Sequence, residues 1–390
     1  MTQKVEAAGQ APPEWVLKAR LGLFVAFLLL IFLTGVHGLG DGFKLLGRNI
    51  LDAFFSATSD PIVALMVGIL TTTLVQSSSV STSMIVGLVA APENPLPLAN
   101  AIPMVMGTNI GTTVTNTFVS LAHIGRPDEF RRAFATATCH DFFNYLTVLI
   151  LLPLELATGY LSRTATALAG AVAVGSDLSY DSPLKGVLQL VLWPVEAAGR
   201  LLFGDWEQAQ GLLLIVASAA LIFAALINLV RTMRRVMLKR AESILARSVG
   251  RSGLVAILVG LVVTMAVQSS SITTSLLVPF AGAGLLTLEQ AFPVTLGANI
   301  GTTVTALLAS LAGSGPNAGL GVTIALVHLL FNLTGTLIFY PFAPLRRLPL
   351  RLAQKFAAAA TRSRKLALAY VFFLFYGLPA LVAFANRLAR

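Results

Sequence analysis

The charged residues of this 390-residue chain are confined to short segments between long apolar runs. A helix of about 20 apolar residues crosses the hydrocarbon core of a bilayer, and only a helix or a closed barrel satisfies its backbone there. The run at residues 133–154 contains one charge, Asp141, and seven further runs contain none. We therefore predict an all-α polytopic membrane protein. The seven charge-free runs are residues 21–40, 61–92, 94–122, 208–230, 252–288, 290–345 and 366–386.

The composition excludes a soluble protein. Only 11% of the residues are charged and 56% are hydrophobic, whereas a soluble domain has about 25% charged residues. The net charge of +10 comes from cations in the segments between apolar runs, which argues against nucleic-acid binding. We find no P-loop, no His/Cys cluster with metal-ligand spacing and no nucleophile–base pair. We therefore expect no enzyme, no ATP-driven pump and no bound transition metal.

The distribution of cations predicts the orientation. Residues 231–252 and 344–366 each contain seven cations, whereas residues 157–210 contain three cations and five acids, a net charge of −2. Cationic loops favour the cytoplasm, which places the N-terminus inside. The predicted division is a cytoplasmic segment at 1–20, a first transmembrane repeat at 21–156, an external loop at 157–207, a second transmembrane repeat at 208–343, and a basic cytoplasmic segment with a C-terminal transmembrane helix at 344–390.

Two halves of the chain share the same motifs in the same order. Residues 76–83 match residues 268–275 at six of eight positions, and residues 106–115 match residues 296–305 at eight of ten. The distribution of charges predicts that the first half begins inside the cell and ends outside, and that the second half begins outside and ends inside. Inverted-topology repeats of this kind are typical of secondary transporters, which bind substrate at the repeat interface. Further matched residues are His140 with His328 and Asn144 with Asn332.

A Gln-Ser-Ser-Ser sequence interrupts the middle of one long apolar run in each half. Serine favours helix N-caps over helix interiors, so we predict a re-entrant helical hairpin with its tip at each sequence. Two facing helix N-termini offer N–H donors to an anion, and the hydroxyls and amides suit a tetrahedral oxyanion. The alternative is that the serines merely allow close helix packing. The predicted anion ligands are Gln76, Ser77, Ser78, Ser79, Gln268, Ser269, Ser270 and Ser271.

An Asn-Ile-Gly-Thr-Thr sequence lies in the middle of a second run in each half, with glycines on both sides of the asparagine and a proline upstream. We expect these residues to break the helix. Unwound carbonyls and Thr or Asn oxygens would then suit Na⁺, although a kink that serves packing is the alternative. The predicted sodium ligands are Thr108, Asn109, Thr112, Thr113, Asn299, Thr302 and Thr303.

Asp141 lies inside a span, where carboxylates are costly and usually functional. Leu329 stands at the matching position of the second half. Three roles stay open for Asp141: it ligates a cation such as Na⁺, carries a proton, or holds Asn144 or His140 in place. His140 and His328 are interpreted as buried hydrogen-bonding groups.

The paired motifs resemble the type II sodium–phosphate cotransporter family over residues 20–385. Residues 129–134, 140–144 and 152–155 strengthen the resemblance. It implies that phosphate binds at the two Gln-Ser-Ser-Ser tips and Na⁺ at nearby Ser, Thr, Gln and Asn oxygens. Electrogenic animal members carry Ala-Gly-Asp, linked to an additional Na⁺, where this chain has Ile124-Gly125-Arg126. The external segment has no cysteine and no glycosylation sequence, which favours a bacterial inner-membrane member.

These observations predict a Na⁺-coupled symporter that moves inorganic phosphate into the cell by alternating access. Its expected partners are phosphate, co-transported Na⁺ and the lipid bilayer, without nucleic acid. The alternatives are a passive anion channel, a Na⁺- or H⁺-coupled symporter of another tetrahedral oxyanion, and an adaptor protein that retains the fold without transport.

Overall fold

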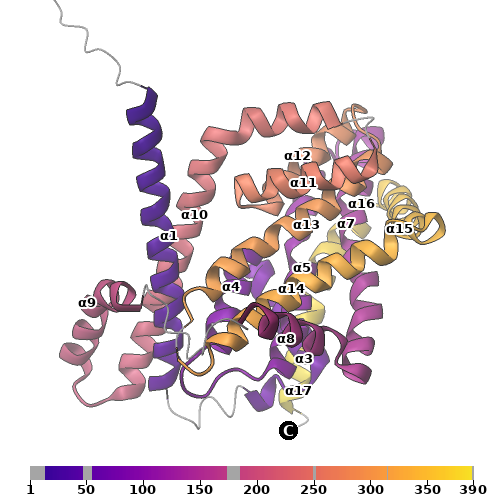
Figure 1. Cartoon of the computed structure of the whole chain (residues 1–390). Helices are drawn as coiled ribbons and strands as arrows, with labels where there is room; N and C mark the ends of the chain where they lie inside the picture. The colour runs from indigo at the N-terminus through magenta and orange to yellow at the C-terminus, as the bar shows by residue number, and fades with distance from the viewer. Residues whose placement is uncertain (1–13, 47–54, 174–184, 249–251, 314, 389–390) are drawn as a thin grey trace, which may run out of the picture.

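The computed structural model describes residues 14–46, 55–173, 185–248, 252–313 and 315–388, and all elements in these ranges are helical (Figure 1). The first half contains α1 (Glu14–Leu45), α3 (Pro61–Val75), α4 (Ser78–Val89), α5 (Leu98–Thr112), α6 (Val114–Leu121) and α7 (Pro127–Thr158). The second contains α10 (Glu207–Ser248), α11 (Gly253–Val267), α12 (Ser270–Gly282), α13 (Leu288–Ser310) and α14 (Ala318–Phe339). The other helices are α8 (Tyr160–Ala173), α9 (Lys185–Phe203), α15 (Ala343–Arg362), α16 (Arg364–Phe372), the π-helix η1 (Phe373–Gly377) and α17 (Leu378–Leu388).

Seven helices of the described chain are long and apolar enough to cross a membrane. This confirms the predicted all-α polytopic membrane protein. One of the seven, Gly186–Phe203, lies within residues 157–207, where we expected an external loop. That segment contains α8 and α9, and α9 packs against α1 and α10 through the fully buried Leu188 and Leu192.

The first helices of the two halves, α1 and α10, run antiparallel and pack closely. Their contacts move toward the C-terminus of α1 and toward the N-terminus of α10. Gly35 lies against Ile222, Gly38 against Ser218, and Gly42 against Ile215. A Cβ at any of these glycines would meet atoms of α10 at less than 3 Å. Small residues therefore let the two helices approach as they do in many membrane proteins. Figure 1 shows the lower part of α1 beside α10, which turns away from α1 toward the top of the view.

The predicted helix break at the Asn-Ile-Gly-Thr-Thr sequence is wrong for the second half. Helix α13 continues without interruption through Asn299, and in the first half only Thr113 separates α5 from α6. In both halves the glycines of this sequence instead allow close packing against a neighbouring helix. A Cβ at Gly297 would overlap the Ile257 carbonyl of α11, and a Cβ at Gly107 would overlap the Leu65 carbonyl of α3. The packing alternative therefore accounts for these glycines, and the carbonyls of α13 remain in the helix.

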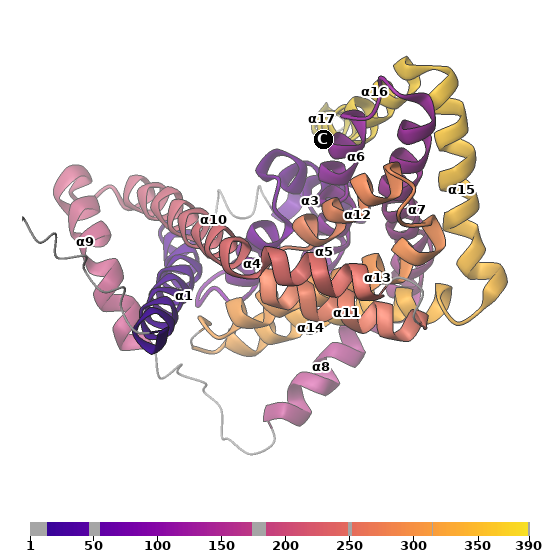
Figure 2. The same ribbon diagram turned by 90° about the horizontal axis from the view of Figure 1, so that it is seen from above.

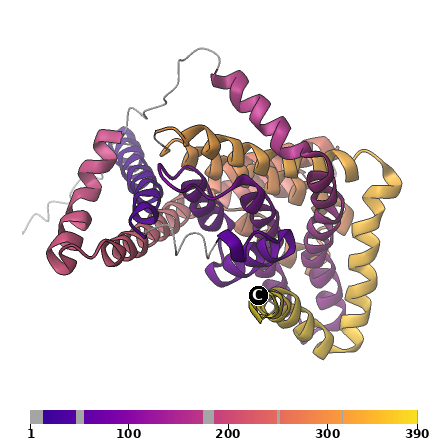
Figure 3. The same ribbon diagram turned by 90° about the horizontal axis from the view of Figure 1, so that it is seen from below.

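Helices α4 and α12, which follow the two Gln-Ser-Ser-Ser sequences, each pack against the opposite half. Helix α4 contacts α13 and α14, whereas α12 contacts α6 and α7. Figures 2 and 3 show both pairs in the centre of the molecule, with α1, α9 and α10 on one flank and α15 on the other. The exchange brings the two Gln-Ser-Ser-Ser sequences into the interface between the halves.

Candidate functional site

Each Gln-Ser-Ser-Ser sequence breaks a helix in the same way. Helix α3 ends at Val75, Gln76 is left-handed (φ 56°, ψ 26°), and α4 begins at Ser78 with Ser77 as its N-cap. In the second half Gln268 has φ 57° and ψ 29°, and Ser269 caps α12. The Ser77 and Ser269 hydroxyl oxygens each accept the N–H three residues ahead at 3.3 Å. The helix interruption predicted at both sequences is confirmed.

The glutamines hold this backbone geometry. A left-handed residue other than glycine is uncommon and needs support from its surroundings. The Gln76 Nε2 donates to the Thr73 carbonyl at 2.5 Å, and the Gln268 Nε2 donates to the Met265 carbonyl at 2.6 Å, so each amide caps the helix that it ends. The Thr115 hydroxyl donates to the Gln76 Oε1 at 3.2 Å. The glutamines thus fix the break, and the serines face the space beyond it.

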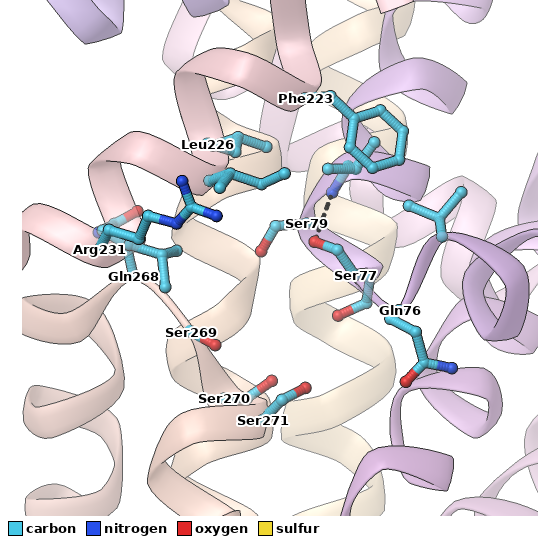
Figure 4. Close-up of a pocket in the computed structure, with 15 residues that line it drawn as sticks. Gln76, Ser77, Ser79, Phe223, Leu226, Arg231, Gln268, Ser269, Ser270 and Ser271 are labelled. Atoms are coloured by element: carbon cyan, nitrogen blue, oxygen red, sulfur yellow. Dashed lines mark hydrogen bonds between the residues drawn. The ribbon is translucent and has the colours of Figure 1, made fainter. Parts of the chain in front are cut away.

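All eight predicted anion ligands line one cavity of about 350 Å³. Figure 4 shows Ser77 and Ser79 on one side of this cavity and Ser269, Ser270 and Ser271 on the other, so that serines of both halves approach each other. Val75, Val80 and five residues of α10 complete the lining. The structure therefore brings together residues that lie about 190 positions apart in the sequence.

The cavity is rich in hydrogen-bond donors. The first N–H groups of a helix have no acceptor within the helix, and α4 and α12 both begin at this cavity. Hydroxyls one turn further along are used internally: the Ser83 hydroxyl donates to the Ser79 carbonyl at 2.6 Å, and the Thr274 hydroxyl donates to the Ser270 carbonyl at 2.8 Å. The donors near the cavity are therefore the first serines of each helix and their N–H groups, aligned with two positive helix ends.

Arg231 of α10 also lines the cavity, and sequence reasoning missed it. Figure 4 shows its side chain on the same side as Gln268, with the guanidinium toward the cavity. The sequence predicts Arg231 in a cytoplasmic loop, because it directly follows the charge-free run 208–230. Helix α10 in fact continues to Ser248, so Arg231 remains on a helix face next to Leu226, Ile227 and Val230, which line the same cavity. A fixed positive charge thus adds to the neutral dipoles of the tips.

The predicted sodium ligands lie outside this cavity, in a buried polar network between the halves. The Asn299 Oδ1 lies 2.6 Å from the His140 Nε2, and the Asn299 Nδ2 donates to the Asn144 Oδ1 at 2.9 Å. In the matching arrangement, the Asn109 Oδ1 lies 3.3 Å from the His328 Nε2 and accepts the Asn332 Nδ2 at 3.0 Å. The threonine hydroxyls of this set donate to carbonyls of their own helices: Thr108, Thr112, Thr113, Thr302 and Thr303.

The two networks differ around Asp141. The side chain of Asn116 contacts the His140 Nδ1 at 3.2 Å, and the matching residue of the second half is Ala306. Asp141 is completely buried, and its Oδ2 accepts the Tyr370 hydroxyl at 2.7 Å and the Thr117 hydroxyl at 3.4 Å. Within the described chain its Oδ1 has no hydrogen-bond partner. Tyr370 belongs to α16, so a helix outside the repeated motifs completes this polar group, which sequence reasoning did not foresee.

Comparisons with known proteins agree with these features. The Na+/Pi-cotransporter family model matches residues 31–172 and 221–381. The chain is 34% identical to sodium-dependent phosphate transport protein 2A of Rattus norvegicus, over 93% of this chain and 67% of that protein. It is 32% identical to sodium-dependent phosphate transport protein 2B of Homo sapiens, over 93% of this chain and 64% of that protein. No solved structure matches the chain at a significant level. The chain belongs to the Na+/Pi-cotransporter family.

Proposed function

We propose that this protein is a secondary active transporter that couples the entry of inorganic phosphate to Na⁺. The observation that carries the proposal is the single cavity lined by both Gln-Ser-Ser-Ser sequences, where two helix N-termini and Arg231 meet. The relatives named above are sodium-dependent phosphate transport proteins, which supports the same function for this chain.

Phosphate is the ligand that suits this cavity. Its four oxygens take donors from several directions, and the cavity offers hydroxyls and helix N-terminal N–H groups from two sides. Arg231 supplies a positive charge and a planar set of donors that fits a phosphate oxygen pair. In this proposal Ser77, Ser78, Ser79 and their counterparts Ser269, Ser270 and Ser271 contact phosphate. Gln76 and Gln268 contribute by stabilising the two helix breaks, which expose these serines to phosphate.

Sodium is proposed to bind near Asp141. A buried carboxylate with one oxygen unpartnered is a costly arrangement that a cation would relieve. The Thr117 hydroxyl donates to the other oxygen of Asp141 at 3.4 Å, Thr113 lies four residues before Thr117, and hard oxygen ligands suit Na⁺. The remaining predicted ligands, Asn109 and Asn299 with their threonines, are proposed to connect this site to the opposite half through the histidine network.

The two halves are proposed to be inverted repeats that move relative to each other in alternating access. The antiparallel contact of α1 with α10 and the exchange of α4 and α12 between halves support this arrangement. We propose a bacterial inner membrane as the location, because residues 157–210 contain no cysteine and no glycosylation sequence. We propose a cytoplasmic N-terminus, because the basic segments at 231–252 and 344–366 favour the cytoplasm.

Radiolabelled phosphate uptake into proteoliposomes tests the proposal. With an inward Na⁺ gradient we expect phosphate to accumulate above equilibrium, and with K⁺ in place of Na⁺ we expect no accumulation. Imposing an inside-negative potential counts the net charge moved, because each charge contributes about 2.3 kcal/mol per 100 mV. Equal uptake without accumulation in both salts would instead indicate a passive anion channel. Accumulation driven by a pH gradient in K⁺ would indicate H⁺ coupling, and accumulation of sulfate in place of phosphate would change the substrate.

Replacing Arg231 by glutamine is expected to raise the KM for phosphate by about tenfold, because a charge-assisted hydrogen bond to an anion contributes about 1.5–3 kcal/mol. The measurement is uptake against phosphate concentration at low and high ionic strength, where the difference between variants should shrink as salt screens the exposed charge. Arg234→Gln is the matched control, since Arg234 lies one turn further on α10 and does not line the cavity. An equal rise in KM for both variants would reduce the role of Arg231 to a general surface charge.

A further inference from the structure

Helix α15 (Ala343–Arg362) has three distinct faces, only one of which packs against the protein. The buried face contacts α7 and consists of residues spaced four, four and three apart. Such spacing places side chains along one side of a helix. Figures 2 and 3 show α15 along the outer edge of the molecule beside α7, with no described helix on its far side. The buried residues are Pro349, Ala353, Ala357 and Ala360, together with Leu350.

A second face of α15 is cationic and exposed. Arg347, Arg351, Lys355 and Arg362 follow one another at intervals of four, four and seven residues, which places them on one stripe. Residues 344–366 contain seven cations and no acid, and among the described residues no carboxylate lies within ion-pair distance of this stripe. Arg346 lies apart from the stripe, over the Tyr340 ring at 5.3 Å.

The third face is apolar, although the protein leaves it uncovered. Leu345 and Leu348 are each 39% exposed, and Leu352 and Ala359 continue the same side at intervals of four and seven residues. An apolar face beside a cationic face is the pattern of a helix that lies in the membrane interface, with its apolar side toward the acyl chains. Figure 1 shows α15 nearly end-on while α1 runs along the picture, so α15 lies across the direction of the membrane-spanning α1.

We propose that α15 lies in the bilayer interface and binds the headgroups of anionic phospholipids through Arg347, Arg351, Lys355 and Arg362. Charge complementarity selects this partner, because each Lys or Arg near an anionic membrane surface favours binding by about fivefold. A separate cavity of about 420 Å³ adjoins the helix at Gln354 and Ala358; Arg131, Arg132 and Glu289 also line it, whereas the four cations of the stripe do not. Lipid binding at α15 is independent of phosphate transport.

The test places a tryptophan reporter on the apolar face of the full-length chain. Leu348→Trp is made in a background where Trp15, Trp193 and Trp206, all exposed, are replaced by phenylalanine. The protein is reconstituted in phosphatidylcholine with a minor fraction of phosphatidylglycerol, and either lipid carries bromine on its acyl chains. We expect brominated phosphatidylglycerol, per molecule, to quench the tryptophan several-fold more than brominated phosphatidylcholine, and we expect this preference to fall at high salt.

Replacing the four cations of the stripe by glutamine should reduce this preference to about one while quenching by both brominated lipids remains, because the apolar face is unchanged. Exchanging Arg and Lys at the same four positions preserves the charge and should preserve the preference. Equal quenching by both lipids in the unaltered stripe would overturn the headgroup assignment. Quenching by aqueous iodide without quenching by either lipid would overturn the interfacial position of α15. The glutamine variant leaves the buried face intact, and circular dichroism checks that it remains helical.

Discussion

Ser78→Pro is expected to raise the KM for phosphate by about 100-fold without unfolding the protein. Ser78 is the first residue of α4, so its N–H has no acceptor within the helix, and proline is tolerated at that position. The preceding Ser77 is extended (φ −153°, ψ 109°), which is the conformation that proline favours in the residue before it. The substitution therefore removes one N–H and one hydroxyl donor from the cavity. Two hydrogen bonds to a charged ligand contribute about 3 kcal/mol or more.

Matched variants separate the contributions of backbone and side chain. Ser78→Ala removes only the hydroxyl and is expected to raise the KM about tenfold. Ser270→Pro should reproduce the effect of Ser78→Pro, because Ser270 begins α12 after an equally extended Ser269 (φ −156°, ψ 111°). Ser81→Ala is the control, since the Ser81 hydroxyl donates to the Ser77 carbonyl and does not line the cavity. Phosphate uptake with an unchanged KM in a folded Ser78→Pro variant would move the substrate away from the tips.

The tips were predictable because a polar run inside a charge-free apolar run has few structural solutions. Serine competes with the helix for hydrogen bonds, and a membrane tolerates a broken helix only where protein or a wet cavity covers it. The repetition of Gln76–Ser79 at Gln268–Ser271 then indicated that both breaks belong to one site. Both breaks have the same backbone angles to within a few degrees, as expected for a shared local sequence.

The break predicted at Asn299 failed because tertiary packing overrides local propensity. Glycine weakens an isolated helix, so Gly297 and Gly301 suggested unwinding. In the folded protein both glycines lie under the backbone of α11, where any side chain would collide with the Ile257 or Leu261 carbonyl. Whether a glycine in a membrane helix marks a break or a close crossing depends on the neighbouring helix, which a single sequence does not reveal.

Arg231 and Tyr370 were missed for a related reason. Both contribute to polar groups formed by helices distant in sequence, and neither lies in a repeated motif. The charge pattern identified where the apolar run before Arg231 ends, but it did not show that α10 continues and turns this side chain toward the tips. Tyr370 follows the basic segment and reaches Asp141 across 229 positions of sequence.

The two proposed sites are connected by hydrogen bonds through the second half. The Ser79 hydroxyl lies 3.5 Å from the Thr305 hydroxyl, which donates to the Gln268 Oε1 at 3.4 Å, so α13 contacts both tips. The same helix carries Asn299, which binds His140 next to Asp141. A cation bound at Asp141 would hold α7 in place, and His140 of α7 would in turn hold α13, the helix that contacts both tips. This connection gives a physical route for Na⁺ to raise phosphate affinity.

Asp141→Asn is expected to abolish the stimulation of phosphate uptake by Na⁺. Asparagine keeps the shape of the side chain and still accepts the Tyr370 hydroxyl, but it removes the negative charge that a buried cation requires. Because the substitution also removes an isolated buried charge, the protein should fold at least as well as the native one. The measurement is phosphate uptake into proteoliposomes against Na⁺ concentration, and uptake by the variant in Na⁺ should fall to the level of the native protein in K⁺.

Asp128→Asn removes the same charge from the exposed start of α7 and should leave Na⁺ activation unchanged. Undiminished Na⁺ activation in the Asp141→Asn variant would exclude Asp141 as the Na⁺ site. If Na⁺ activation remained and only the pH dependence of phosphate uptake were lost, Asp141 would be assigned as a proton carrier instead.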